Sequence, residues 1–381
     1  MSLDPLPTNK DIIEKVEELL EAAYDEKKEF NTDLNGSAPI KIPSLVVGQP
    51  PHQLEASEIL FWTARDAYHD EFSAWEPKHH QDLHRQAIDQ LKANNQLSEF
   101  RNLVEVIKKN RLAPFVGAGL SLACKYPLWG KALDEIAAKI PTLDMAAFKA
   151  KMAAYDYLGA AQLLWDKDDT QVKNYIRNTF DEQPIITHGK KGPVTVLPRI
   201  SRGCVITTNF DPLIEVVFGK GAFDGYMHGN QAGHLFVPRL VKGDRCILKL
   251  HGDAANYNTF VFTESQYTQS YGSPLDFSKA LPKALRQIFV SHSLLFLGCS
   301  LEQDRTLELF QKVYDDKEFD IPDHFAILPQ PADPLIKSAK ETRLLKLNIR
   351  PIWYPHTNHE LVEKYLTLAA DMADGRFNSI I

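Results

Sequence analysis

Residues 114–121 read Pro-Phe-Val-Gly-Ala-Gly-Leu-Ser, a short apolar run that ends in two glycines one residue apart. The apolar run predicts a buried strand, and the glycines predict a tight turn at its end. Such a turn lets backbone N–H groups approach a diphosphate, while Ser121 can donate its hydroxyl or cap the next helix. Glycines also end strands for turn geometry alone, so the rest of the chain has to support a phosphate cradle.

Three later stretches repeat this arrangement of an apolar run followed by polar or glycine-rich residues. They read Val-Ile-Thr-Thr-Asn-Phe-Asp at 205–211, Leu-Lys-Leu-His-Gly-Asp at 248–253 and Phe-Leu-Gly-Cys-Ser at 296–300. Helical patterns lie between them, and alternating strands and helices predict a doubly wound parallel sheet. Ligands bind outside the carboxyl ends of such strands, so a site is expected where these four motifs meet.

The whole pattern predicts an α/β protein with a Rossmann-like doubly wound parallel sheet of about six strands. The expected strands lie near residues 115–116, 204–208, 246–250, 294–297, 325–328 and 349–353, with a hairpin element at 259–262. A helix-rich stretch predicts a helical insertion at about 131–200. Residues 1–97 predict a helical N-terminal extension, with helices over about 1–30, 54–75 and 78–94, before a nucleotide-binding domain at 98–381.

Composition narrows the class of protein. The 381 residues carry a net charge of −7 and no long Lys/Arg block, which argues against a direct nucleic-acid partner. No apolar stretch is long enough for a membrane span, and residues 1–10 lack a signal-peptide core, so a cytoplasmic protein is expected. The four cysteines form no C-x-x-C pair, which predicts a reducing compartment and no bound metal. His80 and His84 share a helical spacing but are interpreted as a solvated helix start.

Together, the four strand-end motifs resemble the Sir2 (sirtuin-like) family, and specifically the SIR2-like NADases of prokaryotic antiphage defence systems. The resemblance covers roughly residues 100–370 and implies a Rossmann-like domain that binds NAD as its substrate. It implies three catalytic residues, Asn209, Asp211 and His251. It also implies a set of NAD-binding residues at the same strand ends: Gly117, Ala118, Gly119, Ser121, Thr208, Gly298, Ser300 and Asp304.

Two departures separate this sequence from the sirtuin deacylases. The cysteine pairs of their zinc module are missing, and residues 126–129 read Tyr-Pro-Leu-Trp where those enzymes carry a Gly-Ile-Pro-Asp-Phe-Arg type of segment. Both differences favour hydrolysis of NAD+ to nicotinamide and ADP-ribose. Two alternatives stay open: a protein deacylase or ADP-ribosyltransferase, and a non-catalytic nucleotide-sensing subunit.

The chemistry of NAD+ cleavage agrees with these residue types. Nicotinamide leaves a cationic ring as a neutral molecule, so no general acid is needed, and the transition state is oxocarbenium-like. Asn209 can orient the ribose and the attacking water, and His251 can act as a base with a pKa near neutral. Asp211 can stabilise developing positive charge or hold the nicotinamide amide. Which residue activates the water is left open by the sequence.

The helices of the first hundred residues present more apolar surface than a solvated segment needs. One stripe comprises Ile12, Ile13, Val16, Leu19 and Leu20, and a second surface comprises Ile59, Leu60, Phe61, Trp62, Phe72 and Trp75. An NADase that is active at all times would be toxic, so its activity is expected to be controlled by assembly with other chains. The sequence therefore predicts a homo-oligomer, a hetero-complex with a separately encoded sensor protein, or both.

Overall fold

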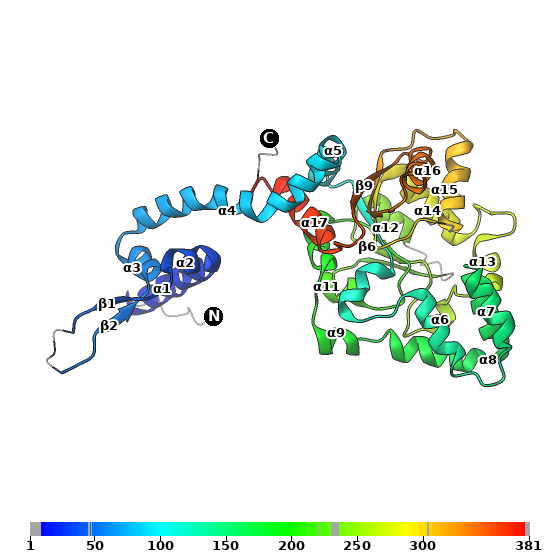
Figure 1. Cartoon of the computed structure of the whole chain (residues 1–381), viewed down its shortest axis with the longest axis horizontal. Coiled ribbons are helices and arrows are strands. Elements are labelled where there is room, and N and C mark those ends of the chain that lie inside the picture. Colours follow the sequence, from blue (N-terminus) through cyan, green and yellow to red (C-terminus); the bar gives the residue numbers. More distant parts are fainter. Residues whose placement is uncertain are drawn as a thin grey trace, which may run out of the picture. The chain divides into compact units, whose positions relative to one another are not determined.

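The computed structural model describes residues 9–44, 46, 48–219, 221–229, 236–302 and 305–377 (Figure 1). The chain divides into two compact units, residues 1–85 and 86–381. The division falls inside helix α4, which runs from Arg65 to Ala93. Asp304, expected from the sequence to contact NAD, lies outside the described residues.

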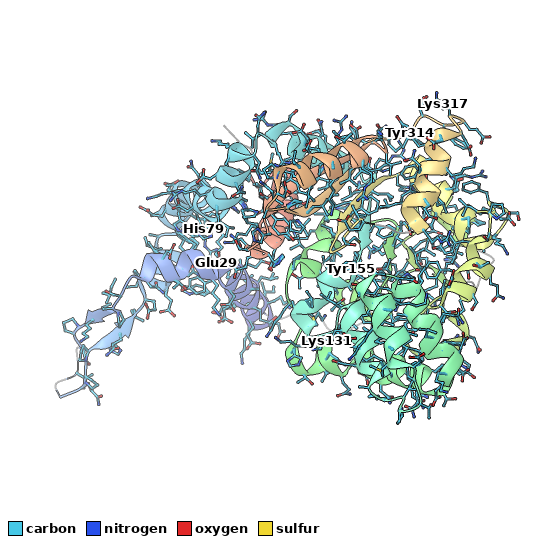
Figure 2. All side chains as sticks on the ribbon, turned by 45° about the vertical axis from the view of Figure 1, so that its right-hand side comes forward. Glu29, His79, Lys131, Tyr155, Tyr314 and Lys317 are labelled. Atoms are coloured by element: carbon cyan, nitrogen blue, oxygen red, sulfur yellow. The ribbon has the colours of Figure 1, made fainter. Side chains whose placement is uncertain are left out.

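The first unit is a small helical cluster with one hairpin. Its elements are α1 (Asn9–Asp25), α2 (Lys28–Asn35), β1 (Ile40–Ile42), β2 (His52–Leu54), α3 (Ala56–Thr63) and the first part of α4. Its core consists of Phe30, Phe61 and Tyr68, and the Tyr68 hydroxyl donates to Asn31 Oδ1 at 2.5 Å. His79 of α4 lies against Glu29 of α2, with 2.9 Å between Nε2 and Oε2 (Figure 2).

Three helix boundaries in this unit differ from the sequence prediction. The single helix expected over 54–75 is wrong, because α3 ends at Thr63 and α4 begins only at Arg65, after Ala64 with a non-helical backbone. The single helix expected over 1–30 is wrong, because the chain turns after Asp25 and α2 brings Phe30 into the core. The expected break between residues 75 and 78 is also wrong, because α4 continues through Pro77. Pro77 removes one helical N–H, and the carbonyl it leaves, that of Ser73, belongs to an exposed residue that water can reach.

The second unit is built on a seven-stranded parallel sheet in the order β5-β6-β4-β3-β7-β8-β9. The strands are β3 (Leu112–Val116), β4 (Val205–Thr207), β5 (Gly225–His228), β6 (Cys246–Lys249), β7 (Ser293–Leu297), β8 (His324–Gln330) and β9 (Ile349–Pro355). From β3 the chain first builds one half of the sheet and then returns to build the other half from β7. This is the Rossmann-like, doubly wound parallel sheet that the sequence predicts.

Two details of the sheet were not foreseen. The seventh strand, β5, lies at an edge and pairs only with β6 among the described strands. Its four residues, Gly-Tyr-Met-His, fall in a stretch that reads as a loop. The predicted hairpin element at 259–262 is wrong: residues 257–259 form the short 3₁₀ helix η3, and the Val261 N–H donates to the His251 carbonyl at 3.0 Å.

Apolar side chains cover both faces of the sheet, which is why its strands read as continuous apolar runs. Leu295 and Leu297 pack on one face, and Leu294 and Phe296 pack on the other. The first face is covered by α5 (Leu97–Lys108), α6 (Trp129–Ala137), α8 (Tyr157–Thr179), α9 (Gln183–His188), α10 (Leu197–Ile200), α11 (Leu213–Phe218) and α17 (Glu360–Ala373). The second is covered by α12 (Phe236–Lys242), α13 (Glu264–Tyr271), α14 (Ala280–Ser291), α15 (Arg305–Asp315) and α16 (Pro334–Leu345).

Between β3 and β4 the chain forms a series of α-helices that begins with α6 and includes α7 (Met145–Ala153). Tyr155, in the turn between α7 and α8, is 79% exposed (Figure 2). Helix α8 is kinked at Asp168, and its first half contacts α13 through a bond from the Ser265 N–H to Gln162 Oε1 at 2.9 Å. Across the described parts of the chain, none of the helices has both the length and the apolar composition needed to cross a bilayer.

Candidate active site

The four motifs singled out in the sequence meet at one edge of the sheet. Strands β6, β4, β3 and β7 are consecutive neighbours and run parallel, so their carboxyl ends lie side by side. The loops that follow them carry His251, Asn209, Gly117 and Gly298 respectively. This is the edge at which open parallel sheets bind their ligands.

The glycine turn after β3 packs against the loop after β7. The Gly117 N–H donates to the Leu297 carbonyl at 2.8 Å, and the Gly119 N–H donates to the Gly298 carbonyl at 3.0 Å. A Cβ atom on Gly117 would lie 2.6 Å from the Gly298 oxygen, and one on Gly119 would lie 2.9 Å from the Gly298 Cα. Close approach of two loops therefore accounts for both glycines here, and their contact with a diphosphate stays a prediction.

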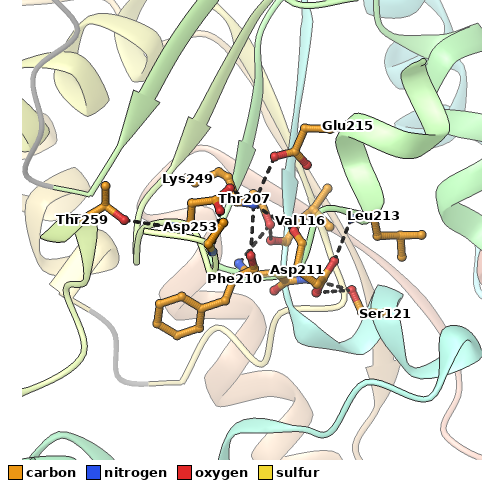
Figure 3. Close-up of polar contacts among 12 residues, drawn as sticks. Val116, Ser121, Thr207, Phe210, Asp211, Leu213, Glu215, Lys249, Asp253 and Thr259 are labelled. Atoms are coloured by element: carbon orange, nitrogen blue, oxygen red, sulfur yellow. Dashed lines mark hydrogen bonds and ion pairs between the residues drawn. The ribbon is translucent and has the colours of Figure 1, made fainter. Parts of the chain in front are cut away.

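Beyond this turn, Asn209, Ser121 and Asp211 form a buried chain of hydrogen bonds. Asn209 Nδ2 donates to Ser121 Oγ at 2.9 Å and to the Gly117 carbonyl at 3.2 Å. Ser121 Oγ in turn donates to Asp211 Oδ2 at 3.0 Å (Figure 3). The structure thus brings together three residues that lie in two separate sequence motifs.

Asp211 is almost completely shielded from water. Its Oδ1 accepts from the Leu213 N–H at 3.1 Å (Figure 3). Burial raises the pKa of this carboxyl to about 6, and it does so against the opposing effects of the Lys249 charge and of the bonds from Leu213 and Ser121. Asp211 therefore titrates close to the physiological range, as functional carboxyls often do.

His251 follows β6 and lies among aromatic rings. Its ring centroid is 5.5 Å from that of Trp129 and 6.1 Å from that of Phe210. Its Nε2 lies 2.5 Å from the Tyr267 hydroxyl. Burial lowers the pKa of His251 to about 4, although a backbone contact with Thr208 acts in the opposite direction. The imidazole is therefore neutral at physiological pH, and its pKa lies below the near-neutral value expected from the sequence.

The remaining predicted residues lie around this group. Thr208 is half-buried and its hydroxyl lies 3.4 Å from Asn209 Oδ1, while Ala118 is half-buried and opens the short 3₁₀ helix η1 (Ala118–Cys124). Gly298 and Ser300 are exposed in the loop after β7. The Ser300 carbonyl accepts from Lys340 Nζ at 2.7 Å, which ties this loop to α16.

Sequence reasoning gave no function to two residues that contact the site. Tyr267 lies on α13 and has no motif of its own, so only the tertiary structure places it beside His251. Lys249 is the last residue of β6 and is fully buried. A lysine that ends an otherwise apolar strand run is a recognisable signal, because a buried ammonium group requires acceptors.

The sheet is Rossmann-like and carries polar groups at its carboxyl edge. Comparisons with known proteins agree with this class of fold. Residues 203–352 match the family of SIR2-like domains. This match spans β4 to β9 and includes the Asn209, His251 and Ser300 motifs. The similarity to SIR2-like domains thus lies within residues 203–352, which are fewer than half of this chain.

Three curated proteins show distant homology to this chain. The NAD(+) hydrolase ThsA of Bacillus cereus (strain MSX-D12) is 27% identical over 227 residues, which are 59% of this chain and 44% of that protein. ThsA of Acinetobacter baumannii (strain 532279) is 28% identical over 204 residues, 52% of this chain and 38% of that protein. Defense-associated sirtuin 2 of Bacillus subtilis is 24% identical over 218 residues, 55% of this chain and 20% of that protein. The chain thus spans less than half the length of these relatives.

Proposed function

We propose that this protein is an NAD+ hydrolase that cleaves NAD+ to nicotinamide and ADP-ribose. The observation that carries the proposal is the buried Asn209–Ser121–Asp211 chain beside His251, at the carboxyl edge of a SIR2-like sheet. Two of the relatives are NAD(+) hydrolases by name, which supports the same reaction.

The reaction breaks the bond between the ribose C1′ and the nicotinamide nitrogen. The bonding electrons go to the ring, which leaves neutral, and the oxygen of water bonds to C1′ and gives up a proton. In this proposal Asn209 orients the water or a ribose hydroxyl through Oδ1, since its Nδ2 already donates within the protein. His251 is neutral and accepts a hydrogen bond from the same hydroxyls. Asp211, when ionised, favours the positive charge that develops on the ribose.

The low pKa of His251 limits its role as a general base. A base whose pKa is about 4 takes up a full proton poorly at pH 7, but it accepts hydrogen bonds throughout the physiological range. Departure of neutral nicotinamide needs no acid, so an orienting histidine is enough for the cleavage step. The final proton then passes to the solvent.

A test compares wild-type protein with Asn209→Ala and His251→Ala. The purified proteins are incubated with NAD+, and nicotinamide and ADP-ribose are separated by chromatography. We expect each variant to fold and to lose about 10²–10⁴-fold in rate. His188→Ala, a change at an exposed histidine at the end of α9, is the control and should keep wild-type activity.

The same assay separates the alternative functions. Nicotinamide release that requires an acetyl-lysine peptide would indicate a deacylase, and transfer of ADP-ribose to protein would indicate a transferase. Binding of NAD+ without turnover would indicate a sensing subunit. Substantial activity in a folded His251→Ala variant would remove His251 from the mechanism.

We also infer that the enzyme acts in antiviral defence by depleting NAD+ on infection, within an assembly that controls its activity. One relative is a defense-associated sirtuin by name, which supports the defence setting. An NAD+ hydrolase active without a trigger would harm its own cell. The assembly is expected to be a homo-oligomer, a complex with a sensor protein, or both.

A further inference from the structure

Lys249 is the most completely buried charged side chain near the site. It has no exposed surface, and its Nζ lies within hydrogen-bond distance of four oxygen atoms (Figure 3). These are the carbonyl oxygens of Phe210 at 3.1 Å and Asp211 at 2.9 Å, Glu215 Oε1 at 3.0 Å and Asp253 Oδ2 at 2.9 Å. Each of them is an acceptor, so the ammonium group is fully satisfied.

The four acceptors come from two different loops. Phe210, Asp211 and Glu215 belong to the loop after β4 and to helix α11, while Asp253 belongs to the loop after β6. Asp253 is itself held in place, since its N–H donates to Thr259 Oγ1 at 2.9 Å and its Oδ1 accepts from the Ala255 N–H at 2.8 Å. One cation therefore joins two loops that share no strand.

These are the loops that carry the proposed reacting groups. The two carbonyls bound by Lys249 are those of Phe210 and Asp211, so the peptide planes on both sides of the Asp211 Cα are held, two residues after Asn209. His251 lies two residues after Lys249 on the other loop. A single side chain is thus bonded to the segment that carries Asp211 and to the segment that carries His251.

We propose that Lys249 is a positioning residue of the NAD+-cleaving site, holding the Asn209–Asp211 loop against the His251–Asp253 loop. This inference rests on the proposed function for its kinetic consequences and on geometry alone for its structural ones. Enzymes lose rate steeply when reacting groups shift, by about 10²-fold for a misplacement of ~1 Å.

The charges around Lys249 show what its removal would change. Three carboxyl groups face it, those of Asp211, Glu215 and Asp253, together with the imidazole of His228. Asp211 is also faced by the neutral groups Tyr126 and Cys124, whose pKa values burial raises. Without the ammonium group the pKa of Asp211 would rise further, because the Lys249 charge opposes the effect of burial.

The test uses the full chain with Lys249→Met, a change that removes the charge and keeps an apolar stem. Lys151→Met is the matched control, because Lys151 is an ion-paired lysine at 2.7 Å from Asp156 in the helical insertion. Two measurements are made. Hydrogen–deuterium exchange follows peptides covering 207–215 and 251–259, and NAD+ hydrolysis gives kcat and KM from pH 5 to pH 9.

In Lys249→Met we expect exchange to be at least ~10-fold faster in both loops, with other segments unchanged. We expect kcat to fall about 100-fold with KM within about threefold of wild type. The acid limb of the kcat profile should move to higher pH by about one unit. Loss of the Lys249 charge alone moves that limb, so the faster exchange in the two loops is the result that shows positioning. Unchanged exchange, or an unmoved limb, overturns the proposal.

Removing one partner of a buried ion pair leaves an uncompensated charge and can prevent folding. If Lys249→Met does not fold, the double variant Lys249→Met/Glu215→Gln is used instead, because it removes one positive and one negative charge together. The same exchange and kcat results are expected of the double variant. Exchange that stays at the wild-type rate in the two loops contradicts the inference. A wild-type protein that releases no nicotinamide removes the proposed function, while the exchange measurement still decides whether Lys249 holds the two loops.

Discussion

Asp211 is a buried titratable group, so it makes the free energy of unfolding depend on pH in a direction that can be stated. Its pKa is about 6 in the folded protein against an ordinary value of 3.8. Between these values the unfolded chain has released the proton and the folded chain keeps it. The free energy of unfolding therefore falls as the pH rises through this window, by up to about 3 kcal/mol.

Asp211→Asn should remove this dependence, because an amide has no charge to bury. We expect the variant to gain stability relative to wild type at pH 8, and to gain less at pH 4.5, while losing NAD+ hydrolysis. Chemical unfolding at the two pH values measures the difference. Asp316→Asn, at an exposed position, is the control. An equal effect of Asp211→Asn at both pH values would show that Asp211 does not titrate in this window.

Tyr267 makes the hydrogen bond that holds the His251 imidazole, so its hydroxyl can be removed alone. Tyr267→Phe keeps the ring and its stacking on Tyr271, whose centroid is 5.5 Å away. We expect kcat to fall by about tenfold or more with KM little changed, because His251 loses its orientation. Tyr314→Phe, on α15, is the control. A rise in activity would instead mean that Tyr267 restrains His251 in the resting enzyme.

At the scale of elements, the contact between the glycine turn and the loop after β7 has a direct test. A Cβ on Gly119 would lie within 3.0 Å of the Gly298 Cα and oxygen, whereas a Cβ on Gly203 would meet no atom within 4 Å. We expect Gly119→Ala to lower the free energy of unfolding by about 1–3 kcal/mol. Gly203→Ala should change it by less than about 1 kcal/mol, in the stabilising direction. Denaturant unfolding of both variants makes the comparison, and equal midpoints would rule out the packing requirement.

At the scale of the whole molecule, the first helix leaves an apolar stripe uncovered within its own unit. Ile12, Ile13, Val16 and Leu19 of α1 are 50%, 58%, 48% and 60% exposed. Four such side chains on one helix face favour association. We expect light scattering of the full chain to show an oligomer, and a variant with all four changed to serine to show a smaller mass. A wild-type chain that is a strict monomer and hydrolyses NAD+ at full rate without a partner would contradict this prediction.

Much of the fold followed from local pattern. Apolar runs that end in glycine or polar residues predicted six of the seven strands, and their alternation with helices predicted the parallel sheet. Edge strand β5 was missed because four residues with two glycine-rich flanks carry little periodicity. The element at 259–262 was mistaken for a strand because alternating aromatic residues bury themselves equally well in a loop that packs on Phe210.

For the site, the sequence by itself determined which residue types stand at the strand ends, since strand direction and the parallel sheet bring those ends to one edge. Only the tertiary structure decided which of them touch. It joined Ser121 to Asn209 and Asp211, lowered the pKa of His251 and placed Tyr267 and Lys249 at the site. The physical reason is that burial and hydrogen-bond partners depend on segments far apart in the chain, which no local pattern contains.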